Sequence, residues 1–519
     1  MKHHGLLYST AILCASNLGL QGLGFIYRIG VSRLAGAEGL GMYQLAYSVY
    51  AIIHAACLSG ITMACSRMSA ELNASGNGGS IGFMTKKVAK TFVLFISIGA
   101  LILYIWRNWI AKDILGDMDI KFIFPIMILC LALTGVENIV KSICIGLDKV
   151  EWAASAELTE QIVRILSVLG LLAFFGGEDR TKVAIMIFVG MCISECVSAS
   201  LLARIYKTKV KVPILKQKPL PAGFSSEFVA VVIPLTFAAI LNNLLASASS
   251  FVLPKRLMVA GLTEEQALYE LGVISGMAMP LILLPIAMVG SLCTVVMPAI
   301  SRSRTQGNKS RIDALVQKAV GVTGLIAIPL TALLVPLAPT LSRLFFGQPL
   351  SLSYVVLLGI EAILVYYQMV TSGILNGLGK QRFVVFSAVA GEILQLVLVW
   401  VLAGNPKLQI YGYILAQALA SVLTVGCNFI YLCTCTQIKN KLLGLFIKPI
   451  ICGLTVFMWV RVLYTFFLGM VGFQWLSVIF SAVSSGIIYV FLLRILGVKL
   501  SDYIQTGKTT NLAFMWGIY

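Results

Sequence analysis

The chain has 519 residues, of which 59% are apolar and 12% charged, and its mean hydropathy is +0.94. An average soluble domain is about 45–50% apolar and about 25% charged, so this composition argues against a soluble enzyme and indicates a polytopic membrane protein. Lys and Arg number 39 against 21 Asp and Glu, a formal net charge of +18. The basic residues are scattered between apolar segments, which favours cytoplasmic loops over a nucleic-acid-binding face.

Apolar segments of transmembrane length follow one another along the whole chain. With about 20 residues for each span, the sequence predicts about fourteen transmembrane helices. In chain order they cover residues 6–31, 40–66, 88–106, 122–146, 155–176, 183–205, 227–253, 271–300, 314–338, 354–377, 384–403, 410–435, 448–468 and 474–494. The first segment has no clear cleavage site, so we expect it to remain as a helix. Pro280, Pro285 and Pro298 are expected to break the eighth span.

The order of the spans predicts an all-α membrane protein with two pseudo-symmetric six-helix lobes. The N-terminal lobe is expected at residues 1–206 and the C-terminal lobe at residues 227–435. A basic cytoplasmic linker at residues 207–226 joins them. Residues 436–519 are expected to add transmembrane helices 13 and 14 and a short cytoplasmic tail.

A short similarity between the two halves supports an internal repeat. The sequence Gly-Leu-Asp-Lys begins at Gly146 and the sequence Gly-Leu-Gly-Lys begins at Gly377. We call the interval between these two glycines the repeat offset, and it also relates Arg164 to Gln395. Six spans in each half give both copies the same orientation. Transporters with such parallel repeats hold their substrate path at the interface of the halves.

The positions of the basic residues predict the orientation in the membrane. With the N-terminus in the cytoplasm, most of the Lys and Arg residues outside the spans fall in cytoplasmic loops, and the densest group lies between Arg204 and Lys218. Both termini of this cell-membrane protein are therefore expected in the cytoplasm. The basic linker is expected to contact anionic lipid.

Ionisable residues inside the predicted spans are the main candidates for a functional site. Each costs about 2.5–3.5 kcal/mol at the bilayer centre and needs a polar partner or a wet cavity. Glu137 and Lys141 lie on one span and Glu160 and Arg164 on the next, each pair at i and i+4, which puts opposite charges on one helix face. This spacing fits a neutralised ion pair that stabilises the bundle as well as it fits a substrate site, and both interpretations stay open.

Other charged residues in the spans have no opposite charge one turn away on their own helix. They are Arg28, Glu195, Glu361, Glu392 and Arg461. Their partners are expected from other helices, lipid or substrate. Arg28 shares its helix with Asn17 and Gln21, so it lines a central cavity with them or extends to the outer interface of the membrane.

Motifs for enzyme chemistry are almost absent from the sequence. There is no nucleotide-binding G-x-x-x-x-G-K-[ST] loop. The string G-x-S-x-G at 78–82 lies between two predicted spans instead of at a strand-to-helix turn, so no catalytic residue is expected. Most of the twelve Cys lie in apolar runs, and the three His lie near the N-terminus, the last of them being His54, so no metal site and no cofactor are expected.

Several stretches of the chain together resemble a known family. Residues 24–28 read G-F-I-Y-R and residues 32–46 read S-R-L-A-G-A-E-G-L-G-M-Y-Q-L-A, and G-M-A-M-P-L at 276–281, M-P-A-I-S at 297–301 and N-G-L-G-K at 376–380 follow in order. They resemble the stage V sporulation protein B and polysaccharide-exporter family of the multidrug/oligosaccharidyl-lipid/polysaccharide (MOP) flippase superfamily, which is related to the lipid II flippase.

This resemblance implies a two-lobed bundle of fourteen helices that moves a lipid-linked sugar by alternating access. The cargo it implies is an undecaprenyl-linked cell-wall or polysaccharide precursor, such as lipid II in sporulation, whose diphosphate suits Arg and Lys side chains. Where this chain has Gln21, related flippases place a basic residue, and where it has Tyr27 and Arg28 the lipid II flippase has an Arg-Asp pair, so only Arg28 carries over. The predicted substrate-binding residues are Arg28, Asn17, Gln21, Arg164, Lys141, Glu160, Glu361, Glu392 and Arg461.

Two other functions stay open at this point. A drug or cation antiporter of the same superfamily would need an acidic residue inside the first or seventh span, and neither interior has one. A scaffold for cell-wall synthesis would tolerate neutral replacement of every buried charge. The expected partners are a lipid-linked sugar, membrane lipids and cell-wall synthesis proteins, and no nucleic acid.

Overall fold

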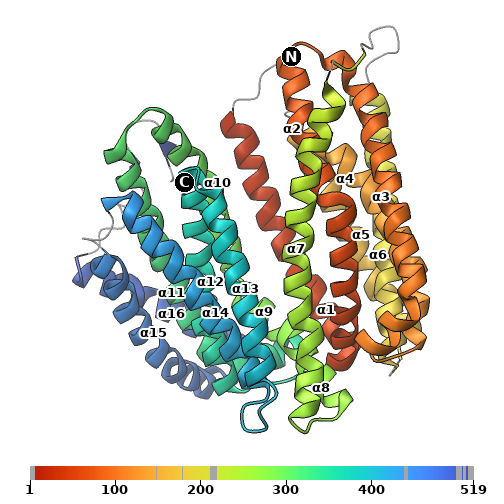
Figure 1. Ribbon diagram of the computed structural model, residues 1–519. Coiled ribbons are helices and arrows are strands. Elements are labelled where there is room, and N and C mark those ends of the chain that lie inside the picture. Colours follow the sequence, from red (N-terminus) through yellow and green to blue (C-terminus); the bar gives the residue numbers. More distant parts are fainter. Residues whose placement is uncertain are drawn as a thin grey trace. The chain divides into compact units, whose positions relative to one another are not determined.

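The computed structural model is built of long α-helices (Figure 1). It describes residues 6–147, 149–177, 179–210, 219–221, 223–437, 442–497, 505–506 and 510–511, with side chains from Gly19 on and without those of 209–210, 442–443 and the two strands. Residues 211–218 and 222 of the predicted linker and most of the C-terminal tail therefore lie outside the described residues. The predicted all-α fold is confirmed, since β1 (Gln505–Thr506) and β2 (Thr510–Asn511) form only a two-residue antiparallel pair.

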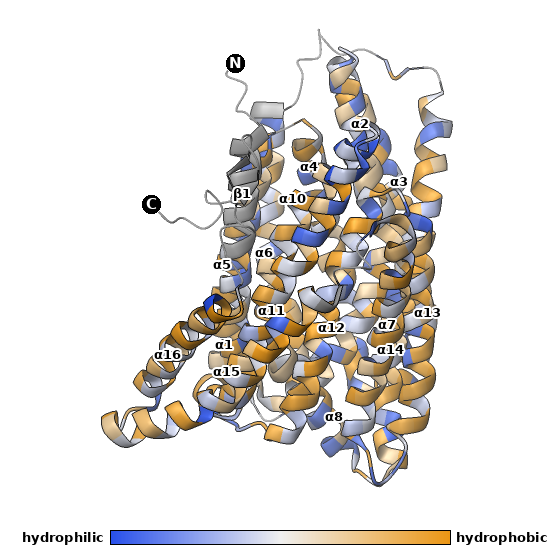
Figure 2. Ribbon diagram, turned by 90° about the vertical axis from the view of Figure 1, so that its left-hand side faces the viewer, coloured by the Kyte–Doolittle hydropathy of each residue, from blue (hydrophilic) through white to orange (hydrophobic). Residues whose placement is uncertain are grey.

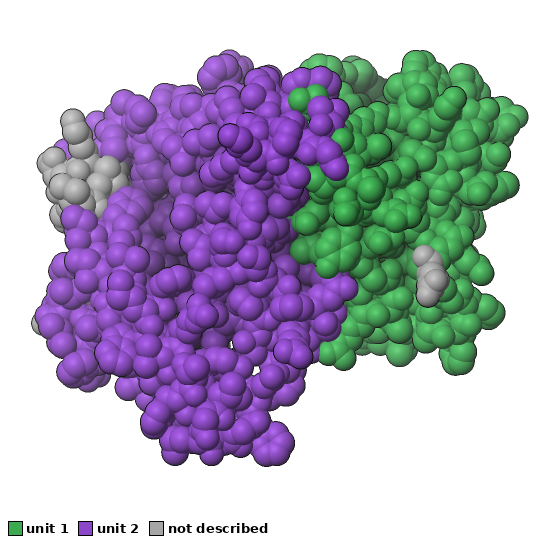
Figure 3. All heavy atoms as spheres, turned by 90° about the horizontal axis from the view of Figure 1, so that it is seen from below, with its two compact units in different colours: residues 1–258, 262–276 green, residues 259–261, 277–519 purple. Residues whose placement is uncertain are grey.

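The chain forms two compact units, residues 1–258 with 262–276 and residues 259–261 with 277–519 (Figure 3). The first unit contains α1 (Leu6–His54), α2 (Gly60–Ala74), α3 (Ile81–Trp109), α4 (Ile123–Gly146), α5 (Val150–Phe175), α6 (Arg180–Ile205), α7 (Phe224–Val259) and α8 (Glu264–Gly272). The second contains α9 (Met279–Ile282), α10 (Ile286–Thr305), α11 (Lys309–Phe346), α12 (Leu352–Gly377), α13 (Gln381–Leu402), α14 (Ile410–Cys435), α15 (Leu442–Val471) and α16 (Gln474–Ile495). Short π or 3-10 segments are η1 (Ala55–Ser59), η2 (Gly78–Ser80), η3 (Ile110–Ile114), η4 (Asp119–Phe122), η5 (Tyr206–Val210) and η7 (Val273–Ala278).

The predicted number of spans is confirmed once α1 is divided at Gly36. The described residues contain 13 candidate membrane-spanning segments, and the first of them, Gly19–Ala74, has 56 residues. At 1.5 Å per residue it would be about 84 Å long, whereas the hydrocarbon core is about 30 Å thick. Gly36 has φ 66° and ψ 174°, which interrupts the helix and leaves two spans in this segment.

Two predicted boundaries are wrong in detail. The predicted spans leave residues 32–39 as a loop, but these residues are helical on both sides of Gly36, since only this glycine leaves the helical region. The eighth span is predicted to begin at residue 271. Residues 271–272 instead end α8, and η7 and α9 follow. The apolar helix of spanning length begins at Ile286, after a turn at 283–285 where Pro285 has no backbone N–H to donate. The expected break at Pro298 is wrong, since α10 continues through this residue.

The repeat offset recurs in the packing of each unit. In the first unit α4 ends at Gly146, where an added Cβ would lie 2.4 Å from the carbonyl oxygen of Ser66 on α2. In the second unit α12 ends at Gly377, where an added Cβ would lie 2.8 Å from the carbonyl oxygen of Met297 on α10. Gly377 follows Gly146, and Met297 follows Ser66, by the same repeat offset. The two equivalent contacts support the internal repeat.

The compact units do not end where the predicted lobes end. Helix α7 packs within the first unit, where the Ser247 hydroxyl donates to the Ser48 carbonyl oxygen at 3.1 Å. Helix α8 packs on the second half of α1, and an added Cβ on Gly272 would lie 1.8 Å from the carbonyl oxygen of Ala37. The six-helix lobes of the repeat, with boundaries at 206, 226 and 435, stay a prediction.

Hydrophobic residues predominate along the helices, as the colours of the ribbon in Figure 2 show. Large apolar residues are among the most exposed, including Phe174 at 85%, Leu166 at 70% and Ile430 at 70% of their surface. A soluble monomer rarely exposes so much apolar surface, whereas helices with satisfied backbone hydrogen bonds present such faces to lipid. The chain is a multi-pass membrane protein.

Candidate functional site

Six charged side chains meet inside the first unit, where α6 packs against both α4 and α5. We call them the charge cluster. Its members are Glu137 and Lys141 on α4, Glu157, Glu160 and Arg164 on α5, and Glu195 on α6. The N-cap Asp179, which accepts hydrogen bonds from the Thr181 and Lys182 amides, fixes the start of α6.

Both predicted i, i+4 ion pairs are present in the charge cluster. Arg164 contacts Glu160 through Nη2, and the same nitrogen lies 3.0 Å from Oε1 of Glu195. Glu195 therefore has a partner from another helix, as predicted. Lys141 Nζ lies 2.8 Å from Oε1 of Glu157 and 3.7 Å from Oε1 of Glu137. Each of the two cations thus lies within ion-pair distance of two carboxylates, and each links neighbouring helices.

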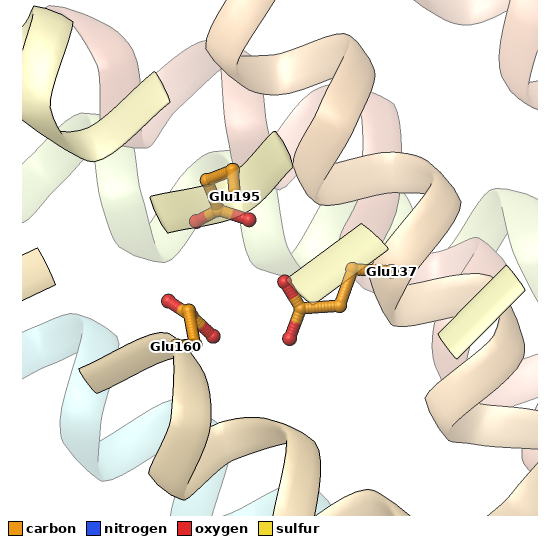
Figure 4. Close-up of side chains that lie close together, drawn as sticks. All are labelled: Glu137, Glu160 and Glu195. Carbon is orange, nitrogen blue, oxygen red and sulfur yellow. The ribbon is translucent and has the colours of Figure 1, made fainter. Parts of the chain in front are cut away.

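Three carboxyl groups of the cluster, those of Glu137, Glu160 and Glu195, face a common space, which Figure 4 shows. One oxygen from each lies within 4.8 Å of the others. The side chains of Glu137 and Glu195 are only 2% and 6% exposed. Both oxygens of Glu137 and Oε2 of Glu195 are buried without a hydrogen-bond partner. These three side chains, which we call the carboxyl trio, are the described group that could hold a cation.

A cavity of about 210 Å³ borders the charge cluster inside the first unit. Arg164 and Glu195 line it, and the other polar side chains around it include Tyr50, His54, Thr134 and Asn243. The Tyr50 and Thr134 hydroxyls are 3.2 Å apart. This volume can hold several waters, each of which occupies about 30 Å³ in the liquid. The carboxyl trio is therefore next to a polar space.

Among the described side chains, no hydrogen bond or ion pair joins Arg28 or Gln21, both predicted on the first helix, to the charge cluster. Arg28 is exposed, and its Nη1 donates to the carbonyl oxygen of Ser275 in η7 at 3.4 Å. Gln21 is also exposed and lies about two turns before Arg28, on the same face of the helix. The side chain of Asn17 lies outside the described residues.

The predicted residues of the second unit do not form a cluster like that of the first. Glu361 on α12 is buried at 4% exposure and its Oε2 has no hydrogen-bond partner. Glu392 on α13 is half-buried and Arg461 on α15 is exposed. No ion pair involves any of these three within the part of the chain that the structure describes. Their role in substrate binding stays a prediction.

The list of predicted site residues lacks several that the structure brings together. It contains Lys141, Glu160 and Arg164 but none of the other three acids of the charge cluster. It also lacks the cavity residues from α1. Tyr43, Tyr47, Tyr50 and His54 recur at three- and four-residue spacing, which is the signal that could have identified one polar aromatic face of this helix.

The helices and the buried charges define a polytopic membrane protein with a charged site inside its membrane-spanning region, and comparisons with known proteins identify its family. A family model described as polysaccharide biosynthesis protein matches residues 6–304, and a second model, MatE, matches residues 238–401. Because the first match covers more than half of the chain, the protein belongs to the polysaccharide biosynthesis protein family. The resemblance predicted from the sequence is confirmed.

The most similar relatives include two proteins of Bacillus subtilis (strain 168). Stage V sporulation protein B is 24% identical over 430 residues, which is 82% of this chain and 82% of that protein. Lipid II flippase MurJ is 23% identical over 545 residues, covering 97% of this chain and 99% of that protein. Both relatives match over most of their length, so the protein is a flippase or transporter of the MOP superfamily.

Solved structures show the same fold. The inward closed conformation of lipid II flippase MurJ matches with a TM-score of 0.69 and 16% identity, covering 93% of this chain and 98% of that one. An inward-facing multidrug resistance MATE family transporter of the MOP superfamily matches with a TM-score of 0.61 and 15% identity, covering 81% of this chain and 98% of that one.

Proposed function

We propose that this protein moves an undecaprenyl-linked cell-wall or polysaccharide precursor, such as lipid II, across the cytoplasmic membrane by alternating access. The observation that carries the proposal is the similarity to stage V sporulation protein B over 82% of this chain and to a lipid II flippase over 97% of it. The proposed orientation puts both termini in the cytoplasm, so the cargo would enter from the inner leaflet and leave on the outer one.

The properties of Arg28 support a cargo with phosphate groups. Its guanidinium carries five N–H donors, and one hydrogen bond, to Ser275, is found for it among the described residues. Since the side chain is exposed, the other donors are available to a ligand. A planar guanidinium can bind two phosphate oxygens at once, which suits a lipid diphosphate. Gln21, on the same helix face, would add a neutral hydrogen-bonding group to this site.

Replacement of Arg28 tests this function in cells depleted of their own flippase. Arg28→Lys should keep part of the export of cell-wall precursor because the charge remains, whereas Arg28→Ala should lose at least about tenfold, which corresponds to the loss of one charge-assisted hydrogen bond of about 1.5–3 kcal/mol. Arg107→Ala is the matched control, since Arg107 is exposed at the end of α3 and stacks on Tyr104. Normal export by Arg28→Ala at equal membrane levels would show that Arg28 does not bind the cargo.

A drug or cation antiporter is the second candidate, and the carboxyl trio is the observation that favours it. The trio supplies buried acidic groups on α4, α5 and α6 instead of on the first or seventh span. An antiporter would protect cells from a cationic drug without restoring precursor export, so the same depleted cells, challenged with such a drug, separate the two functions.

A further inference from the structure

The charge cluster is not neutral if every member is ionised. It contains four carboxyl groups, of Glu137, Glu157, Glu160 and Glu195, but only two cations, Lys141 and Arg164. All six side chains are at least half buried between helices. Carboxylates that share one site repel each other, and burial disfavours the charged form further, so such groups commonly share a proton. With all six groups ionised the cluster would have an excess of negative charge, which one or two additional positive charges would neutralise.

Glu137 is the acid of the cluster whose negative charge is least compensated by nearby cations and hydrogen-bond donors. Its side chain is only 2% exposed, its nearest cation is Lys141 Nζ at 3.7 Å, and neither of its oxygens accepts a hydrogen bond. A charge-assisted hydrogen bond has a donor–acceptor distance of about 2.7–2.9 Å, so Lys141 does not supply one. The carboxyls of Glu160 and Glu195 face Glu137 in Figure 4, and one oxygen from each of the three lies within 4.8 Å of the others. A proton on one of the three would provide the missing donor.

The internal repeat shows that the fold does not require these charges. At the repeat offset, the five cluster positions on α4 and α5 correspond to neutral residues on α12 and α13. They are Gln368, Ser372, Ala388, Gly391 and Gln395. The helices there pack through small and hydroxyl residues, with an added Cβ on Gly391 only 2.1 Å from Oγ1 of Thr424. The charges of the first unit are therefore an addition to a packing arrangement that works without them.

We propose that Glu137, Glu160 and Glu195 form a proton-binding site, in which one proton is shared by the three carboxyl groups and exchanged with water in the adjoining cavity. Glu195 lines that cavity, and its buried Oε2 accepts no hydrogen bond. If the protein exports a lipid-linked precursor as proposed, exchange of this proton would couple that export to the proton gradient. This coupling rests on the proposed function. The site itself does not.

A proton suits this site better than a metal ion. Arg164 and Lys141 already occupy positions against the carboxyl groups, so a metal ion between the three acids would lie beside two fixed cations. A proton adds one charge without needing space for further ligands. The surrounding titratable and charged groups lie on α1, α2, α4, α5 and α6. They are Tyr27, Tyr43, Tyr47, Tyr50, His54, Cys65, Cys130, Lys141, Glu157, Arg164 and Cys192.

Infrared spectroscopy of the purified full-length protein in lipid nanodiscs tests the site without any cargo. A neutral carboxylic acid has a carbonyl stretching band that an ionised carboxylate lacks, and the band shifts in heavy water. The buried acid of the second unit is first removed by Glu361→Gln, so that it contributes nothing. In this background we expect a neutral-carboxyl band at neutral pH. Glu137→Gln should remove it or shift it, and Glu160→Gln and Glu195→Gln should do the same.

Two control variants separate this site from other groups. His54→Gln removes the imidazole that lines the cavity, and Glu71→Gln removes an exposed carboxylate, 49% exposed, that pairs with Arg67. Neither should change the band. If the band of the Glu361→Gln protein survives unchanged in all three trio variants, the proposal is overturned. Loss of this band when sodium chloride is added would overturn it too, since that would indicate a metal ion instead. Absence of the band from the Glu361→Gln protein itself would overturn the proposal even if no trio variant folds.

This readout distinguishes the site from the proposed function. A protein that has the band but does not export precursor would refute the lipid flippase and keep the proton site. If precursor export is restored and the band is absent, the flippase stands and the proton site is refuted.

Discussion

Removal of Arg164 is the most informative single change in the charge cluster. Arg164→Gln keeps the length of a polar side chain but removes the only cation in contact with Glu160 and Glu195 among the described residues. The side chains of these acids are 12% and 6% exposed, so water cannot replace the lost partner fully. Removing one partner of a buried ion pair typically costs about 3–5 kcal/mol, because a charge is left uncompensated.

Protonation sets an upper limit to this cost. A carboxylate that loses its partner can take up a proton, which at pH 7 costs about 3.7 kcal/mol for a group whose unfolded-state pKa is about 4.3. We therefore expect the free energy of unfolding to fall by about 3–4 kcal/mol at pH 7. Because protons become more available at lower pH, the loss should shrink by about 1.4 kcal/mol for each pH unit down to about pH 5.

Unfolding by SDS in mixed micelles at pH 6, 7 and 8 measures this loss. Arg67→Gln is the matched control, since Arg67 and Glu71 form an exposed i, i+4 pair at 2.8 Å that water screens, so its removal should cost little at any of these pH values. The double variant Glu160→Gln with Arg164→Gln should recover part of the stability. If Arg164→Gln costs no more than Arg67→Gln, or if its cost does not change with pH, the account of the cluster as a buried charge network is wrong.

Two further predictions concern the topology and the packing of the first unit. The topology is tested in a background without the exposed Cys196 and Cys435. A cysteine in place of Lys86 should react with an impermeant thiol reagent only from the cytoplasm, and a cysteine in place of Glu265 only from outside. The reverse labelling pattern would show that the proposed orientation is inverted. Gly272→Ala should lower the free energy of unfolding by about 1–3 kcal/mol, because the new Cβ would meet the Ala37 carbonyl oxygen. Gly170→Ala on α5 is the control and should be neutral or stabilising, since the space around Gly170 is open. Equal thermal stability of the two variants would contradict the close approach of α8 to α1.

The sequence predicts the parts of this fold that depend on local pattern. Spans follow from apolar segments about 20 residues long, and the pairs Glu137–Lys141 and Glu160–Arg164 follow from helical spacing alone. The bend at Gly36 is harder to place. Ser32, Arg33 and Glu38 look like loop residues, but helix formation tolerates all three, and one glycine with positive φ is enough to interrupt the helix.

The meeting of three carboxyl groups could not be predicted, because it depends on how three helices pack. Glu137, Glu160 and Glu195 are each compatible with an isolated buried acid, and their distances in sequence contain no information on which faces meet. For the same reason the sequence predicts Arg28, Glu361 and Arg461 together with the cluster, since each is a charged residue in a span. Sequence reasoning identifies the residue types that need a partner but can assign partners only within one helix.

The internal repeat supplies the comparison that a single sequence otherwise lacks. Gly146 and Gly377 mark equivalent close contacts, and a side chain that both units need for packing should recur at the same offset, as these glycines do. Glu137 and Arg164 instead correspond to Gln368 and Gln395, which keep polar groups of similar length and lose the charge. A packing role explains the shared length of these side chains, but it does not explain a buried charge, which costs free energy wherever a neutral amide suffices. The charge is therefore the feature that requires a function, and loss of that function without loss of fold is the expected outcome when Glu137 becomes Gln.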